Sequence, residues 1–234
     1  MTLPSVDEVR SRVEALITAH WSDEITVRAW WSLLAANGWS SPTLPEEAGG
    51  LGWPGDLAGA VTATLTRSNV LGPPGGLGLT LAAPTVARYG TPEQIAAWVP
   101  SILDGTAGWC QLFSEPQAGS DLAGLQTRAE RDGDDWVITG QKVWTSTGQT
   151  ADLAMLIART DPDAPKHQGI TYFVIAMDQP GIEVRPLREM TGQAVFNEVF
   201  LDGARVPAAN VVGGLHGGWA VANATLGFER AATS

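Results

Sequence analysis

The segment QTRAERDGDDWVITG, residues 126–140, decides how the middle of this chain folds. Two short alternating polar and apolar runs flank Asp132-Gly133-Asp134, and this arrangement is typical of a β-hairpin. Turn-forming residues at 161–165 and at Pro180-Gly181 separate the segments that follow. The further β-rich segments are residues 152–160, 170–177, 182–187 and 195–201. We therefore expect a β domain over residues 108–214.

Residues 1–107 have a helical pattern instead. In residues 5–21, the apolar Val6, Val13, Leu16 and Ile17 recur at helical spacing, and a second pattern around Trp30 ends at Asn37-Gly38. A third helix is expected to begin with Thr91 as N-cap, Pro92 at the first position and Gln94 completing a capping box. Pro100 should kink or break it. The Gly- and Pro-rich residues 40–56 and 69–79 are expected to be loops that could line a site.

The helical pattern returns in residues 215–234. Trp219, Ala222, Ala224 and Leu226 fit one helix after Gly217-Gly218, and no capping signal precedes Ser234. We expect the apolar face of this helix to pack against a part of the protein outside this sequence, so the chain is expected to be a fragment. The fold class is then α+β: an all-α domain, a β-barrel-like or sandwich domain, and the first helix of a C-terminal helical domain.

Charge and composition narrow the partners. The chain has 14 Lys and Arg against 25 Asp and Glu, a net charge of −11, which disfavours nucleic acid and anionic membrane surfaces. No apolar run approaches the ~20 residues that span a bilayer. Cys110 is the single cysteine, which fits a reducing cytoplasm, and the three histidines lie far apart. We expect a cytoplasmic protein that binds no membrane and no metal.

Two segments are candidates for a ligand site: FSEPQAGSDLAG at 113–124 and GQKVWTSTG at 140–148. Taken alone, Ser120 or Asp121 before Leu122 is more typical of a helix cap than of a site, and Trp144 more typical of a core strand. No G-x-S-x-G elbow occurs, and GGLGLT does not join a strand to a helix as a Rossmann fingerprint would.

Three segments carry a family resemblance: residues 44–54 (LPEEAGGLGWP), 109–175 and 190–207 (MTGQAVFNEVFLDGARVP). In order and spacing they resemble acyl-CoA dehydrogenases, particularly the actinobacterial type. The resemblance spans essentially the whole chain. It implies an N-terminal helical domain, a central β domain and a C-terminal four-helix bundle, most of which would follow Ser234. In that family FAD lies between the β domain and the bundle, with a second subunit contributing.

The resemblance also assigns site residues. Matched to the family's two flavin-binding segments are Gln111, Phe113, Ser114, Gly119 and Ser120 in the first, and Trp144, Thr145 and Ser146 in the second. Hydroxyls and main-chain amides can hydrogen-bond a flavin without a cation, and an indole can pack on its rings. Ser120, with Lys166 and His167 of the loop DPDAPKHQG, is implied in acyl-CoA binding, although solvated loop residues are the simpler interpretation of Lys166 and His167.

The implied reaction is α,β-dehydrogenation of an acyl-CoA thioester: a Glu removes the α-proton while the β-hydrogen leaves as hydride to flavin N5. Most relatives take that Glu from the bundle beyond Ser234, but one subgroup places it where this chain has Glu229. A solvated helix residue paired with Arg230 is an equally good interpretation of Glu229. The implied partners are the acyl-CoA, an electron-transfer flavoprotein or similar acceptor, and further subunits in a homodimer, tetramer or heteromer.

The sequence is also compatible with two further functions. The chain can belong to a non-catalytic or half-site subunit of a heteromeric dehydrogenase, or to an acyl-CoA oxidase, whose reduced flavin reacts with oxygen. The acyl group cannot be identified, because most of its pocket would lie in the bundle.

Overall fold

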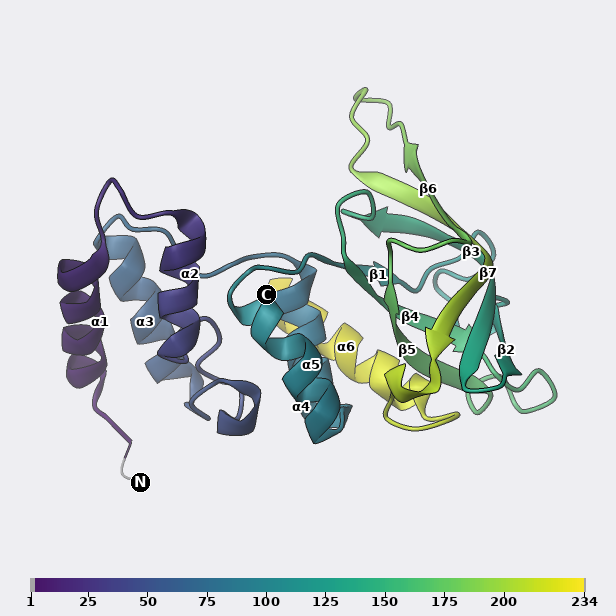
Figure 1. The fold of residues 1–234 in the computed structure, drawn as a ribbon, viewed down its shortest axis with the longest axis horizontal. Coiled ribbons are helices and arrows are strands. Elements are labelled where there is room, and N and C mark those ends of the chain that lie inside the picture. Colours follow the sequence, from purple (N-terminus) through teal and green to yellow (C-terminus); the bar gives the residue numbers. More distant parts are fainter. Residues whose placement is uncertain (1–2, 234) are drawn as a thin grey trace. The chain divides into compact units, whose positions relative to one another are not determined.

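The computed structural model describes residues 3–233, with side chains to residue 231. Contacts divide the chain into two compact units, Met1–Gly75 with Pro92–Thr106, and Gly76–Thr91 with Ala107–Ser234 (Figure 1). This grouping does not test the expected domain limits of 1–107, 108–214 and 215–234, which stay predictions. Because each unit has its own buried core, each is described by itself.

The first unit is helical. Its helices are α1 (Val6–His20), α2 (Val27–Ala36), α3 (Gly55–Arg67) and α5 (Pro92–Leu103), with a 3-10 turn at Glu46–Ala48. Ser5 caps α1 in a reciprocal capping box with Glu8, and Asn37 ends α2 as expected. The core of this unit is apolar and rich in aromatic residues: Val9, Val13, Trp30, Leu34, Trp39, Trp53, Leu57, Val61 and Leu65.

The helices add two details to the prediction. Val6 lies in α1 as expected but is 39 % exposed, and the buried residues of α1 are Val9 and Val13. Pro100 does not break α5, which continues to Leu103. A proline removes one backbone hydrogen bond, and here it does so only three residues before the helix ends. Helix α5 begins at Pro92, as expected.

The second unit begins with a π-helical turn, Gly78–Ala82, that leads into α4 (Ala83–Tyr89). The expectation of a loop up to residue 79 was therefore wrong at its end. The sheet that follows has the strand order β6-β7-β3-β2-β4-β5-β8, with β1 paired to β4. Its strands are β1 (Trp109–Leu112), β2 (Arg128–Asp132), β3 (Asp135–Ser146), β4 (Leu153–Arg159), β5 (Ile170–Ala176), β6 (Ile182–Leu187), β7 (Phe196–Pro207) and β8 (Val211–Val212).

Residues 126–140 contain the predicted hairpin. Strands β2 and β3 pair antiparallel up to Asp132 and Asp135, and Gly133 takes a φ of 61° in the turn between them. Strand β2 also pairs with β4 through one parallel pair, Arg128 with Arg159. The core of the sheet is buried and apolar, including Leu112, Ile138, Leu156, Phe173 and Val199. The α+β order of helices, sheet and a final helix is confirmed.

The last element of the described chain is helix α6 (Gly218–Thr233), which is shown in yellow in Figure 1. Its buried residues, among them Val221, Ala222 and Thr225, pack on β5, on the π-helical turn and on α4. The Thr225 hydroxyl lies 2.9 Å from that of Thr85 on α4. Residues 78–89 and β5 cover Ala222 of the predicted apolar face, whereas Trp219, Ala224 and Leu226 stay only half-buried, so the expected cover from outside the sequence stays a prediction for these three.

Candidate flavin site of the sheet

The structure brings the two candidate segments together at one end of β3. The Ser114 carbonyl accepts a hydrogen bond from the Val143 N–H at 2.9 Å, and the Phe113 carbonyl accepts one from Lys142 Nζ at 3.1 Å. Residues that are 29 positions apart in the sequence are thus direct neighbours. A ligand that contacts one segment here is close to the other.

A buried ion pair joins these segments. Lys142 Nζ lies 2.8 Å from Glu115 Oε1, and both side chains are almost fully buried. The same ammonium donates to the carbonyl of Ile157 on β4, and the Glu115 carboxylate accepts from the N–H groups of Gln126 and Thr127. Each member of the pair therefore has hydrogen-bond partners that offset the loss of water.

The surroundings shift the pKa of both charged groups. Burial lowers the pKa of Lys142 to about 8, against the opposing effect of Glu115. Burial by itself raises the pKa of Glu115, but the charge of Lys142 and the hydrogen bonds outweigh it and hold the pKa below its ordinary value. At neutral pH the pair is therefore an ammonium facing a carboxylate.

A β-bulge directly after Lys142 turns Trp144 out of the sheet. Lys142 pairs with Val199 of β7, but the next pair is Thr145 with Asn197, so β3 holds one residue more than β7. Trp144 adopts a φ of 60°, a left-handed conformation that is unfavourable for a tryptophan. Its side chain is 63 % exposed and makes an edge-on contact with Phe196. The alternative interpretation of Trp144 as a buried strand residue is therefore wrong, and its assignment to the flavin stays a prediction.

Around Trp144 lie polar groups without protein partners. The Thr145 hydroxyl, the Gln111 amide nitrogen and the Asn197 side-chain oxygen are hidden from solvent and make no hydrogen bond, while the Asn197 amide holds the Thr145 carbonyl at 2.9 Å. Ser114 and Ser146 are half-buried. Buried polar groups of this kind normally have partners, so these three are available to a bound ligand.

The other end of the first segment reaches the β4–β5 loop. Lys166 Nζ contacts both carboxylate oxygens of Asp121, at 2.7 and 2.9 Å, and both side chains are exposed. Gly119 and Ser120 are exposed beside this pair. The helix start expected at Leu122 is a single 3-10 turn, and no side chain caps it. The structure therefore places Ser120 near Lys166.

His167 contacts helix α6, and Glu229 is a residue of that helix. The His167 ring packs on Trp219 of α6, with ring centroids 4.8 Å apart. Glu229 is exposed near the C-terminal end of α6, one turn beyond the buried Thr225. Neither residue belongs to the cluster around Trp144, and the roles expected of them stay predictions.

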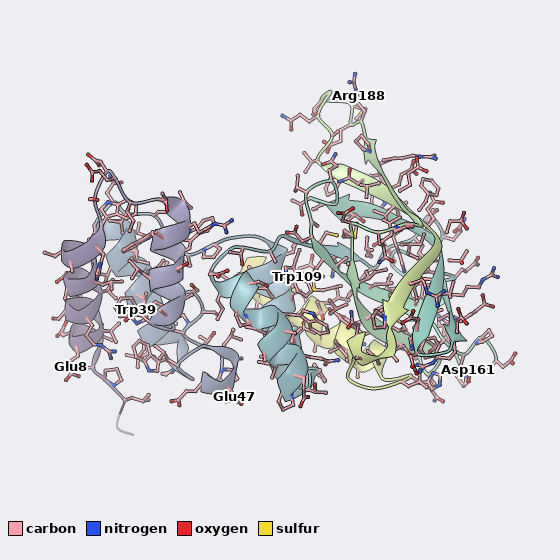
Figure 2. The ribbon with its side chains drawn as sticks, in the orientation of Figure 1. Glu8, Trp39, Glu47, Trp109, Asp161 and Arg188 are labelled. Atoms are coloured by element: carbon pink, nitrogen blue, oxygen red, sulfur yellow. The ribbon has the colours of Figure 1, made fainter. Side chains whose placement is uncertain are left out.

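The sheet has two distinct ends. Figure 2 shows Arg188, in the loop between β6 and β7, and Asp161, in the β4–β5 loop, at opposite ends of the unit. The start of β7 pairs with the end of β3, next to Trp144, whereas Lys166 belongs to the loop that contains Asp161. Residues 113–121 run between these two regions, which is an arrangement suited to an elongated ligand.

Three further observations concern metal ligands, membrane-spanning helices and Cys110. Within residues 3–231, no group of three or more His, Cys, Asp and Glu side chains could hold a metal ion. In the same part of the chain no helix combines the length and apolar character needed to cross a membrane. Burial raises the pKa of the Cys110 thiol to about 12, so this residue stays a thiol and is no nucleophile.

Glu115 and Lys142 were not among the residues predicted from the sequence. The signal for Lys142 was available: Trp136, Ile138 and Lys142 lie at even spacing on β3, so the alternation places a lysine on the core face. A lysine there requires a buried acceptor. Nothing in the local pattern identified that acceptor as Glu115.

Known proteins similar to this chain belong to one family. Residues 5–106 match the family model of the acyl-CoA dehydrogenase N-terminal domain, and residues 110–203 that of the middle domain. The acyl-CoA dehydrogenase FadE34 of Mycobacterium tuberculosis is 58% identical over 151 residues, covering 64% of this chain and 21% of FadE34. The acyl-CoA dehydrogenase IpdE1 of the same organism is 45% identical over 203 residues, covering 87% and 53%.

Solved structures give the same result. A variant of the Tcur3481-Tcur3483 steroid ACAD has a TM-score of 0.77 at 33% identity, covering 96% of this chain and 62% of that one. The ChsE4-ChsE5 complex from M. tuberculosis has 0.74 at 31%, covering 97% and 61%. A glutaryl-CoA dehydrogenase from M. smegmatis in complex with FADH2 has 0.64 at 28%, covering 97% and 60%.

The chain therefore spans about half of IpdE1, about a fifth of FadE34 and about three fifths of the similar solved chains. Two family models that together match residues 5–106 and 110–203, with relatives of the same name, establish the relationship. The chain belongs to the acyl-CoA dehydrogenase family.

Proposed function

We propose that this chain forms the flavin-facing part of an FAD-dependent acyl-CoA dehydrogenase, which removes two hydrogens from the α and β carbons of an acyl-CoA thioester. The observation that carries the proposal is Trp144. A large aromatic side chain is held in a left-handed backbone conformation and is left exposed at a bulge. Such strain costs of order 1 to 3 kcal/mol and is concentrated at functional sites.

The residues beside Trp144 fit an isoalloxazine ring. The exposed indole offers a flat apolar surface against which a planar ring can stack. The half-buried Ser114 and Ser146, and the unpartnered groups of Gln111 and Thr145, offer donors and acceptors for the polar edge of that ring. None of these groups is charged, so the site suits the neutral ring of a cofactor.

Ser120 and the loop that follows β4 fit a phosphate-bearing part of a ligand. Gly119 is exposed, and a Cβ there would meet nothing within 4 Å, so its backbone is open to close approach. Lys166 holds only an exposed pair with Asp121, which contributes little to stability and can be exchanged for a phosphate.

The reaction also needs an acceptor for the hydride and a base for the α-proton. Bound FAD supplies the acceptor for the hydride that leaves the β-carbon. Glu229 is the candidate base for the α-proton. In the described chain it is exposed, so further parts of the enzyme would have to cover it before it could face a bound thioester away from water. Electrons would then pass to an electron-transfer flavoprotein or a similar acceptor.

A second candidate is a subunit of a heteromeric dehydrogenase. Two of the similar structures carry the names of two proteins each, Tcur3481-Tcur3483 and ChsE4-ChsE5. In this function, residues 111–146 would contribute one wall of a site that a different subunit completes, and Glu229 need not be the base.

The test uses the full polypeptide that contains this chain, purified with FAD. We expect a yellow protein, and expect Trp144→Ala to weaken FAD binding at least tenfold, as measured by flavin fluorescence titration. Val27→Ala, which changes an exposed apolar residue of the helical unit, is the matched control and should bind FAD like the parent. A parent that stays colourless with FAD alone but binds it with a partner subunit would support the second candidate.

The same preparation tests the base and distinguishes a dehydrogenase from an oxidase. A parent that binds no FAD with or without a partner would refute both candidate functions. In a protein that binds FAD, Glu229→Gln with unchanged flavin reduction by substrate would exclude Glu229 as the base. Peroxide production without another electron acceptor would identify an oxidase.

A further inference from the structure

We propose that Lys142 and Glu115 form a positioning pair that fixes the backbone of both flavin segments, so that replacing the pair weakens flavin binding more than it weakens the fold. The inference rests on the proposed function for its flavin readout. It concerns two residues that touch no part of the expected ligand and act through Ser114 and Trp144.

The pair ties four separate stretches of the chain at one point. Lys142 Nζ has three donors and three acceptors within 3.1 Å: the Phe113 carbonyl, Glu115 Oε1 and the Ile157 carbonyl. The Glu115 carboxylate in turn accepts from two backbone N–H groups, those of Gln126 at 2.6 Å and Thr127 at 3.0 Å. The three acceptors of Lys142 and the two backbone donors to Glu115 come from different parts of the chain, so the pair holds these stretches at fixed distances from one another.

That point lies between the residues expected to meet the flavin. Phe113 and Glu115 are both held, so Ser114 between them has its direction fixed on each side. Lys142 is the last residue of β3 before the bulge, and the next residue, Val143, donates to the Ser114 carbonyl at 2.9 Å. Fixing Lys142 therefore fixes where the bulge begins and which way Trp144 leaves the sheet.

Stability alone does not explain a lysine at this position. Strand alternation places residue 142 on the core face, where an apolar side chain would pack without desolvating a charge. Replacing a buried ion pair by apolar or neutral groups is often neutral for stability. An apolar side chain, however, cannot hold the carbonyls of Phe113 and Ile157 in one orientation.

The experiment replaces both charges together in the FAD-bound full polypeptide, because Lys142→Met alone leaves Glu115 charged and buried and can prevent folding. The double variant Lys142→Met with Glu115→Gln keeps the length of side chain 115 and shortens side chain 142 by one atom. We expect its FAD dissociation constant to rise at least tenfold and its visible flavin spectrum to shift, while the urea midpoint of the apoprotein falls less than that of Lys142→Met alone. The control is Arg205→Met with Asp132→Asn, which removes an exposed ion pair of the same sheet and should leave flavin binding unchanged.

A readout without flavin separates this inference from the proposed function. In the apoprotein, the Val143 amide should exchange its hydrogen at least tenfold faster in the double variant than in the parent. The Ile138 amide, in the regular part of β3, should be unaffected. If the parent binds no FAD, the proposed function fails, and the exchange of Val143 still decides the inference.

Two results would overturn the positioning pair. One is a double variant with unchanged Val143 exchange. The other is a double variant whose FAD affinity stays within twofold of the parent although the parent binds FAD. A loss of FAD affinity equal to that of the control pair would count against it in the same way, since it would reflect a general effect of charge removal.

Discussion

The pairing of β3 with β7 contains two β-bulges, and a different residue takes the left-handed conformation in each. Near the hairpin, Ile138 pairs with Ala204 and Thr139 with Asp202, so the extra residue is Gly203 on β7, with a φ of 75°. At the other end the extra residue is on β3, and the left-handed position is taken by Trp144 with a φ of 60°. Glycine is the residue that adopts this conformation without strain.

Their neighbours differ in the same way. Beside Gly203, Arg205 makes an exposed ion pair with Asp132, and the core position on β3 is the apolar Ile138. Beside Trp144, the core position is Lys142 in a buried ion pair. One bulge follows the rules for a stable sheet, whereas the other breaks them with a strained aromatic residue and a buried charge. Such local conflicts are expected where a site has been built into a fold.

The largest contrast should come from the two tryptophans of β3. Trp136→Ala removes a buried ring that packs edge-on against Phe173, so we expect a loss of about 3 to 5 kcal/mol in the free energy of unfolding. Trp144→Ala removes an exposed ring and should change it by less than about 0.5 kcal/mol. Urea denaturation of the sheet unit measures both. Equal losses would show that Trp144 is a structural residue.

The two ion pairs should differ nearly as much. Lys142→Met leaves Glu115 charged without its cation in the core, which costs about 3 to 5 kcal/mol. Arg205→Met removes two ion pairs at the surface, with Asp132 and Asp135, and should cost less than about 1 kcal/mol. The double variant of Lys142 and Glu115 should recover most of the loss of the single one, measured by the same urea transition. A single variant as stable as the parent would mean that the pair is not a closed unit.

The sequence pattern correctly predicted the structural features that depend on residues close together in the sequence. The hairpin at Gly133 follows from alternation and turn residues alone, as do the starts of α5 and α6. The π-helical turn at Gly78–Ala82 was missed because its glycines are typical of a loop, and with it part of the cover of α6 was missed. Its helical form depends on packing against α6, far along the sequence.

The candidate site shows the same limit. Its residues were assigned by resemblance, since the local pattern favoured a turn and a core strand. The exposure of Trp144 depends on a bulge that pairing with Asn197 defines, and the partner of Lys142 lies 27 residues away. Strand alternation could show that Lys142 points into the core, but only the three-dimensional structure shows that Glu115 is its ion-pair partner.

The buried pair should also be visible in the pH dependence of stability. Glu115 has a lowered pKa in the folded protein, so the unfolded chain binds its proton first as the pH falls. Its contribution is present above the ordinary pKa of about 4.5 and is lost as the pH falls through the folded value. Between about pH 5 and pH 3, the parent should therefore lose more stability than the double variant of Lys142 and Glu115, in parallel urea titrations. Parallel curves would contradict this.

The smallest effects come from exchanging residues at the two left-handed positions. Gly203→Ala places a Cβ where nothing lies within 4 Å, so only backbone strain opposes it, and we expect a loss of about 1 kcal/mol. At the other bulge, Trp144→Gly should be more stable than Trp144→Ala by about 1 kcal/mol, the reverse of the usual order in a strand. Thermal unfolding of the four proteins measures both differences. If alanine were the better residue at position 144, the left-handed backbone would not be a source of strain, and the exposed tryptophan would lose its value as a sign of function.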